Sequence, residues 1–225
     1  KAKGHPHHRV QESREHKIPT ISMDYMYFVR EGDVEKGLPT LVMVDDKTGM
    51  IWARVLKQKG IEEYAIKTAV KFIELLGYTR IILKTDGEPA IKAFKEEIKK
   101  HASVEIIPEE APIHESKSQG VCERANQRVQ EQFRAMKDAL ECRLGTRLKE
   151  GNTLVPWMIS HAADTINRYH VTTEGKTGYE KWKGKEFITP SPEFGERVHF
   201  LRPGTKRKGR ERCQMVRRML HWYQE

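Results

Sequence analysis

The chain has 225 residues, a mass of 26.2 kDa and a formal net charge of +9, so it is long enough for one well-formed core with tails. Its mean hydropathy is −0.72, and no apolar run approaches the roughly 20 residues of a membrane span, so we expect no membrane partner. Three widely spaced cysteines without a Cys-x-x-Cys pair argue against a zinc knuckle or a disulfide framework and favour a reducing compartment.

The residue pattern predicts an α/β order of elements. Strands are expected at 20–29, 40–46, 50–56, 79–86 and 103–109, and helices at 62–76, 87–101, 119–144 and 153–169, with a polar loop at 110–119. The turn residues from Asp46 to Gly49 predict a hairpin between the second and third strands. We expect the first three strands to form an antiparallel meander and the later, helix-linked strands to add in parallel.

Asp24 lies in the middle of the first expected strand, which is apolar on both faces. Alternation places Ile21, Met23 and Tyr25 on one face and Asp24 with Met26 on the other. An unpaired carboxylate in such a strand costs several kcal/mol unless a cation meets it. The alternative is that this end of the strand is exposed and Asp24 is solvated.

Asp86 closes an apolar strand and is followed at once by Gly87 and a helix. Open α/β sheets place ligand-binding groups at the carboxyl ends of their strands. The alternative is that Asp86 serves the turn or caps the helix.

Glu123 lies near the start of the long helix expected at 119–144. Helix geometry separates an apolar stripe for the core from a polar face. The stripe contains Val121, Ala125, Val129, Phe133, Met136 and Leu140, and the polar face contains Glu123, Gln127, Gln130 and Arg134. The polar face could bind phosphate or base edges, or it could be an ordinary solvated face.

The positive charge is confined to the two ends of the chain. Lys and Arg outnumber Asp and Glu by 5 to 2 in residues 1–17 and by 9 to 3 in residues 196–225, whereas the middle has 27 of each. Basic ends on a neutral domain indicate a polyanion partner, most simply nucleic acid, or else solubilising tails.

The three acids together resemble the D,D-35-E catalytic core of retroviral and retrotransposon integrases. Sixty-one residues separate Asp24 from Asp86, and thirty-six separate Asp86 from Glu123. The segments "LVMVDDKTGMIWARVLKQKG", "LKTDGEPAI" and "SQGVCERANQRV" are similar to the family's, and "INRYHVTTEGKTGYEKWKGKEF" is similar to a copia-type retrotransposon run. The chain departs from the family's pattern at Gln119, Gln127, Gln130 and Gly178, and residues 1–225 do not show the family's zinc-binding His-His-Cys-Cys pattern.

The resemblance implies a ribonuclease H-like fold, with a five-stranded mixed sheet flanked by helices. It divides the chain into a basic, His-containing linker (1–17), a catalytic core (18–190) and a basic C-terminal extension (191–225) that is truncated and binds DNA. It also implies two Mg²⁺ ions, replaceable by Mn²⁺, with Asp24 bridging them, Asp86 on one and Glu123 on the other.

The implied reactions are trimming of the element's 3′ ends and their transfer into target DNA. The implied partners are element and target DNA and further copies of the chain, and an active enzyme would work in the nucleus. We expect DNA contacts from His114, Lys117, Gln119, Asn126, Gln127, Gln130 and Arg134, and from Lys206, Arg207, Lys208 and Arg210 in the basic end.

Two alternatives to an active integrase remain open. One is a catalytically lost or domesticated integrase-like protein that binds nucleic acid. The other is a ribonuclease H-type nuclease, which commonly has a fourth acid in the first helix; Glu62, Glu63 and Glu74 are the candidates.

Overall fold

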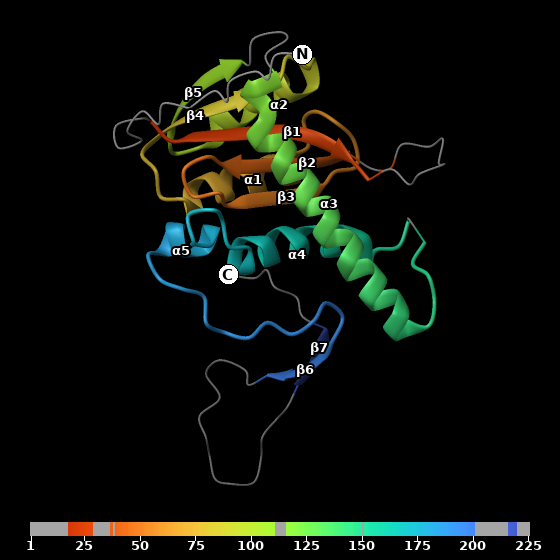
Figure 1. Cartoon of the computed structure of the whole chain (residues 1–225). Helices are drawn as coiled ribbons and strands as arrows, with labels where there is room; N and C mark the ends of the chain where they lie inside the picture. The colour runs from red at the N-terminus through yellow and green to blue at the C-terminus, as the bar shows by residue number, and fades with distance from the viewer. Residues whose placement is uncertain are drawn as a thin grey trace, which may run out of the picture.

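The computed structural model describes residues 18–28, 37, 39–110, 116–149, 151–200 and 216–219 (Figure 1). Five strands form the main sheet: β1 (Thr20–Tyr27), β2 (Pro39–Asp45), β3 (Ile51–Val55), β4 (Arg80–Thr85) and β5 (Glu105–Glu110). Five helices follow or flank them: α1 (Glu63–Leu75), α2 (Pro89–His101), α3 (Ser116–Leu144), α4 (Leu154–Tyr169) and α5 (Gly178–Lys183). Strands β6 (Arg197–Phe200) and β7 (Val216–Met219) pair separately.

The order of strands in the main sheet is β3-β2-β1-β4-β5. Strands β1, β2 and β3 are antiparallel neighbours, whereas β4 and β5 add in parallel to β1. The predicted meander and the predicted parallel addition are therefore both confirmed. The hairpin between β2 and β3 turns at Gly49, whose φ of 78° suits a glycine.

Both faces of the sheet are buried, and β1 explains how. Ile21, Met23 and Tyr25 belong to the core formed with α1 and α2, whereas Met26 belongs to the core under α3 and α4. Figure 1 shows α3 crossing the sheet on the second of these faces. Alternation along β1 is thus confirmed, and it places Asp24 on the α3 face.

The long helix α3 begins earlier than the sequence predicted. It starts at Ser116, so the interpretation of residues 116–119 as part of a loop is wrong. No glycine or proline lies between Ser116 and Gln119, and Gly120 has no positive φ, so nothing in this stretch prevents the helix from forming. Lys117 and Gln119, which we expected in a loop, lie in the first turn and a half of α3.

The sequence analysis did not predict helix α5, which lies within the segment that is similar to the copia-type run. The Thr177 hydroxyl accepts a hydrogen bond from the Glu180 amide at 3.1 Å, which caps the start of α5. Gly184 ends the helix with φ 71°. The Trp182 indole donates to the Leu75 carbonyl at 3.2 Å, at the end of α1. Thr177, Trp182 and Gly184 of this segment therefore have structural roles: they cap α5, attach it to α1 and end it.

The same segment contains Asn167, which completes the outer edge of the sheet. Its side-chain oxygen accepts from the Ile51 amide, and its side-chain nitrogen donates to the Ile51 carbonyl, each at 2.7 Å. Ile51 lies on β3, an edge strand, so its outward-facing backbone groups have no neighbouring strand. Asn167 supplies the two missing hydrogen bonds from α4.

Within the part of the chain that the structure describes, no helix combines the length and hydropathy needed to cross a bilayer.

Candidate functional site

Asp24 and Asp86 lie beside each other at one end of the sheet. Strands β1 and β4 are parallel neighbours, and their register pairs Met23 with Thr85. Asp24 is the next residue of β1 and Asp86 directly follows the end of β4, so the two are level with each other across strands that are about 4.8 Å apart. The two acids are therefore neighbours across adjacent strands.

Asp24 is half-buried, and its carboxylate accepts hydrogen bonds from two donors. One carboxylate oxygen accepts from the Tyr25 amide at 2.7 Å, and the other accepts from the Asn126 side chain at 3.2 Å. Burial, and then the negative charge of Asp86, raise the pKa of Asp24 to about 6, against smaller lowering effects of these two donors and of Lys59. Asp24 is therefore not simply a solvated residue at an exposed strand end.

Asp86 serves the turn that leads into α2. One of its carboxylate oxygens accepts from the Glu88 amide at 3.1 Å. The turn interpretation considered for Asp86 thus describes a real contact, but this contact occupies only one oxygen. The same carboxylate is close enough to Asp24 to raise the pKa of that residue.

Glu123 lies on α3, three residues before Asn126, which binds Asp24. It is exposed, and it lies about two turns into the helix because α3 begins at Ser116, so its expected position in the first turn is wrong. The buried Cys122 thiol beside it has a pKa raised mainly by burial and then by the charges of Asp24, Asp46, Asp86 and Glu123. All four acids are therefore near enough to act on the charge of Cys122, a buried residue that the predicted apolar stripe did not include.

Asp46 is an acid near the site that the sequence analysis considered only as a turn residue. The Ser22 hydroxyl donates to its carboxylate at 3.1 Å. Burial raises the pKa of Asp46 to about 6, and the negative charge of Asp45 contributes to this rise. The hydrogen bond from Ser22 and the positive charges of Lys84 and Arg124 act in the opposite direction. Because Asp46 is exposed as a whole residue, solvent screens its charge, and we give Asp24 the greater weight.

Apart from Lys117 and Gln119 in the first turns of α3, the polar residues predicted to touch DNA fall into three groups. Asn126 and Gln130 face the sheet: Asn126 binds Asp24, and the Gln130 amide lies 3.9 Å from the Met26 sulfur. Gln127 and Arg134 are exposed on α3. His114, Lys206, Arg207, Lys208 and Arg210 lie outside the described residues.

The residues of the site suit a hard divalent cation, although they do not yet form a closed metal site. Among the described residues, no group of three or more His, Cys, Asp or Glu side chains is arranged to hold a metal ion. Carboxylate oxygens are nevertheless the donors that Mg²⁺ prefers, and two crowded acids gain from a cation between them. The buried side-chain oxygen of Asn126, next to Asp24, also has no hydrogen-bond partner in the described part of the chain. Asp24 and Asp86 therefore fit such an ion, with Glu123 as the third candidate ligand.

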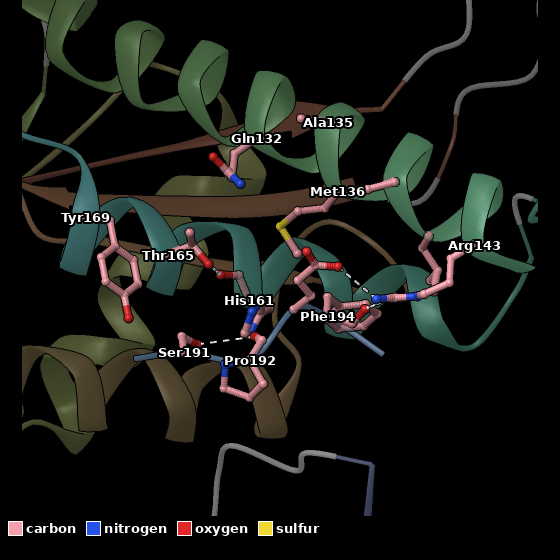
Figure 2. A pocket seen from close by; sticks show the side chains of 13 residues that line it. Gln132, Ala135, Met136, Arg143, His161, Thr165, Tyr169, Ser191, Pro192 and Phe194 are labelled. Carbon is pink, nitrogen blue, oxygen red and sulfur yellow. Dashed lines mark hydrogen bonds and ion pairs between the residues drawn. The ribbon is translucent and has the colours of Figure 1, made fainter. Parts of the chain in front are cut away.

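A separate cavity of about 320 Å³ lies between α3, α4 and the segment 191–194. Figure 2 shows His161, Thr165 and Tyr169 of α4 along its wall. Burial lowers the pKa of His161, and its ring lies 5.5 Å from that of Phe194. None of the three acids lines this cavity, so we do not assign it to the candidate site.

The raised pKa of Asp24 predicts how the stability of the metal-free protein depends on pH. The folded state holds this proton more tightly than the unfolded state, whose Asp titrates near 3.8, so stability is greatest in acid and falls as pH rises through about 6. We expect wild type to be about 1 kcal/mol more stable at pH 5 than at pH 7.5 from this group alone.

Urea unfolding at both pH values checks this prediction. Asp24→Asn should remove that part of the difference, whereas Asp138→Asn, an exposed acid on α3, should leave it in place. An equal pH dependence in wild type and Asp24→Asn would contradict the prediction.

The chain matches no family model and no curated protein. Among solved structures, the catalytic core domain of BIV integrase is 22% identical, with a TM-score of 0.49 over 73% of this chain and 93% of that chain. The HTLV-2 integrase catalytic core domain in complex with magnesium (trimeric form) is 21% identical, with a TM-score of 0.50 over 73% of this chain and 97% of that chain.

A chain of the simian T-cell lymphotropic virus intasome, solved in complex with a PP2A regulatory subunit, is 20% identical, with a TM-score of 0.53. That match covers 78% of this chain and 58% of the other. At 21% and 20% identity, the matches with TM-scores of 0.50 and 0.53 show a shared fold. The chain has the ribonuclease H-like fold of integrase catalytic core domains, as the sequence predicted.

Proposed function

We propose that the chain is the catalytic core of a retrotransposon integrase, a Mg²⁺-dependent polynucleotidyl transferase that processes 3′ DNA ends and joins them to target DNA. The observation that supports this proposal most directly is that Asp24 on β1 is level with Asp86, directly after β4, and that Asn126 of α3, the helix that also contains Glu123, binds Asp24. Paired carboxylates at this edge suit phosphoryl transfer, which needs charge stabilisation and no protein nucleophile.

In this proposal each residue has a stated role. Asp24, Asp86 and Glu123 would hold two Mg²⁺ ions, or Mn²⁺ in their place, which when bound activate a water or a DNA 3′-hydroxyl and stabilise the leaving oxygen. Asn126 holds the Asp24 carboxylate through its side-chain nitrogen, and the Glu88 amide holds Asp86. Both acids would thus be oriented before a substrate binds.

The partners follow from the same proposal. Gln127 and Arg134 are exposed on α3 and are available to a DNA backbone, and Lys117 and Gln119 in the first turns of α3 are proposed to lie beside the reacting phosphate. We further propose that the basic end binds DNA, that several copies act together, and that a copia-type element is the source. An active enzyme of this kind would reach its target in the nucleus.

A ribonuclease H-type nuclease is less well supported than an integrase. Its fourth acid would come from the region of α1, but the three candidates there bind other groups. Glu62 accepts from the Lys57 amide, Glu63 pairs with Lys67, and Glu74 accepts from the Ser103 hydroxyl.

Strand transfer with duplex oligonucleotides that carry the element's own termini tests the proposal, in Mg²⁺ and in Mn²⁺. Wild type should join these ends to target DNA, and Asp86→Asn should lower the rate at least about a hundredfold, the usual cost of losing one group that stabilises reacting charge. Asparagine keeps an oxygen for the Glu88 amide, so the turn should survive. Asp138→Asn is the matched control and should remain active.

The outcomes separate the alternatives. Cleavage of RNA–DNA hybrids without any joining of DNA ends would favour the ribonuclease. DNA binding without either reaction would favour a domesticated, inactive copy.

A further inference from the structure

Lys59 lies in the segment that joins β3 to α1, and its ammonium group is held from several sides. It contacts both carboxylate oxygens of Glu88 at 2.7 Å. It also lies 5.1 Å from the centre of the Tyr25 ring and 5.3 Å from the centre of the Tyr27 ring. A cation over two aromatic faces and against a carboxylate has little freedom to move.

The Lys59–Glu88 pair is connected to both acids of the candidate site. The Glu88 amide donates to Asp86, so the residue that pairs with Lys59 is also the one that holds the Asp86 carboxylate. The next residue, Gly60, donates its amide to the Tyr25 hydroxyl at 3.2 Å, and Tyr25 follows Asp24 on β1. The segment around Lys59 is thus bound to the side chains of Tyr25 and Glu88, which lie one and two residues from Asp24 and Asp86, on the sheet face opposite α3.

This pair differs from an ordinary surface ion pair. Exposed pairs contribute little because solvent screens them and their long side chains stay mobile. The Lys67–Glu63 pair on α1 is of that kind, with side chains 68% and 82% exposed. The side chains of Lys59 and Glu88 are only 27% and 32% exposed. The contacts and partial burial of the Lys59–Glu88 pair therefore restrain its side chains more than those of the exposed Lys67–Glu63 pair.

We propose that Lys59 is a positioning residue of the candidate metal site, which clamps Glu88 so that the turn holding Asp86 stays level with Asp24. This inference rests on the proposed function, because it assumes that the two acids bind a divalent cation. Lys59 itself would touch neither the metal nor the DNA. Its effect would pass through Glu88 and the Glu88 amide.

Mn²⁺ binding, followed by electron paramagnetic resonance of the free ion, tests the proposal on the full chain. Charge alone predicts that Lys59→Met binds Mn²⁺ more tightly, because a cation has been removed near the site. If Lys59 positions Glu88, the Mn²⁺ affinity of Lys59→Met should instead fall. We expect a fall of about tenfold, as is usual when a group that orients a metal ligand is lost. Lys59→Arg should stay within about twofold of wild type because it can keep the pair.

Two further variants make the comparison specific. Lys67→Met breaks the exposed pair on α1 and should leave Mn²⁺ affinity unchanged. The exchange Lys59→Glu with Glu88→Lys keeps the net charge and restores a pair in reverse, so it should recover part of the lost affinity. Affinity in Lys59→Met that equals or exceeds that of wild type would overturn the proposal.

Hydrogen exchange of the Glu88 amide gives a readout that needs no metal. Lys59→Met should speed this exchange because the hydrogen bond to Asp86 opens more often, and unchanged exchange would overturn the clamp. Wild type that binds no Mn²⁺, or binds it equally in Asp86→Asn, would overturn the metal site and with it the proposed function. Normal Asp86-dependent binding together with an unaffected Lys59→Met would overturn the role of Lys59 alone.

Discussion

Asn167→Leu is expected to lower the free energy of unfolding by about 3 kcal/mol, because it leaves two buried backbone groups without partners. Asn167 is 5% exposed and Ile51 only 2% exposed, so water cannot replace the lost hydrogen bonds at the Ile51 amide and carbonyl. Leucine has the same branching and the same number of side-chain heavy atoms as asparagine, so the change removes the hydrogen bonds without opening a cavity. Urea unfolding would measure the shift in midpoint at constant slope.

Ser160→Ala is the matched control for this prediction. Ser160 also lies on α4 and donates to the same edge strand, at the Ala53 carbonyl, at 3.2 Å. The Arg54 guanidinium donates to that carbonyl as well, at 2.7 Å, so the acceptor keeps a partner when the serine is lost. We expect a loss below about 1 kcal/mol. Similar losses in the two variants would show that the pairing of Asn167 with Ile51 has no special weight.

The sheet and the place of its two aspartates could be predicted from the sequence because both depend on short-range patterns. The period of two along β1 determines which side chains share a face. Asp24, in the middle of β1, and Asp86, directly after β4, are level because the parallel register pairs Met23 with Thr85, and the order of helices and strands implied that these strands are neighbours.

The contacts that shape the site could not be predicted in this way, because they join residues far apart in the chain. Asn126 and Asp24 are 102 positions apart, and Lys59 and Glu88 are 29 apart. Nothing in the local pattern of α3 distinguishes Asn126, which binds an acid of the site, from the exposed Gln127 beside it. Only the packing of α3 across β1 selects between them.

The prediction of where α3 begins was wrong for a different reason. Serine, lysine and glutamine around residues 116–119 have the composition of a loop, and Gly120 strengthened that interpretation. Composition is a weak guide at a helix end, where a short stretch can extend a long, well-packed helix at small cost. As a consequence Glu123 lies further inside α3 than predicted, where its backbone is held by the helix on both sides.

Glu123→Gln is expected to abolish both 3′-end processing and strand transfer, with losses of at least about a hundredfold, if Glu123 is the third acid of the site. Glutamine keeps the size and helix propensity of glutamate, and Glu123 is exposed, so folding stability should change by less than about 0.5 kcal/mol. DNA affinity should also survive, because the variant removes a negative charge and no basic group.

The control for Glu123 is Glu131, which is exposed on α3, about 12 Å further along the helix and about 80° around its axis from Glu123. Glu131→Gln should keep full activity in the same strand-transfer assay, with thermal unfolding and DNA binding measured on both variants. Because both reactions would use the same acids, a variant that loses one reaction and keeps the other would contradict a shared site. Near-normal Mg²⁺-dependent joining by Glu123→Gln would leave Asp24 and Asp86 as a pair without this partner, and would exclude Glu123 from the site.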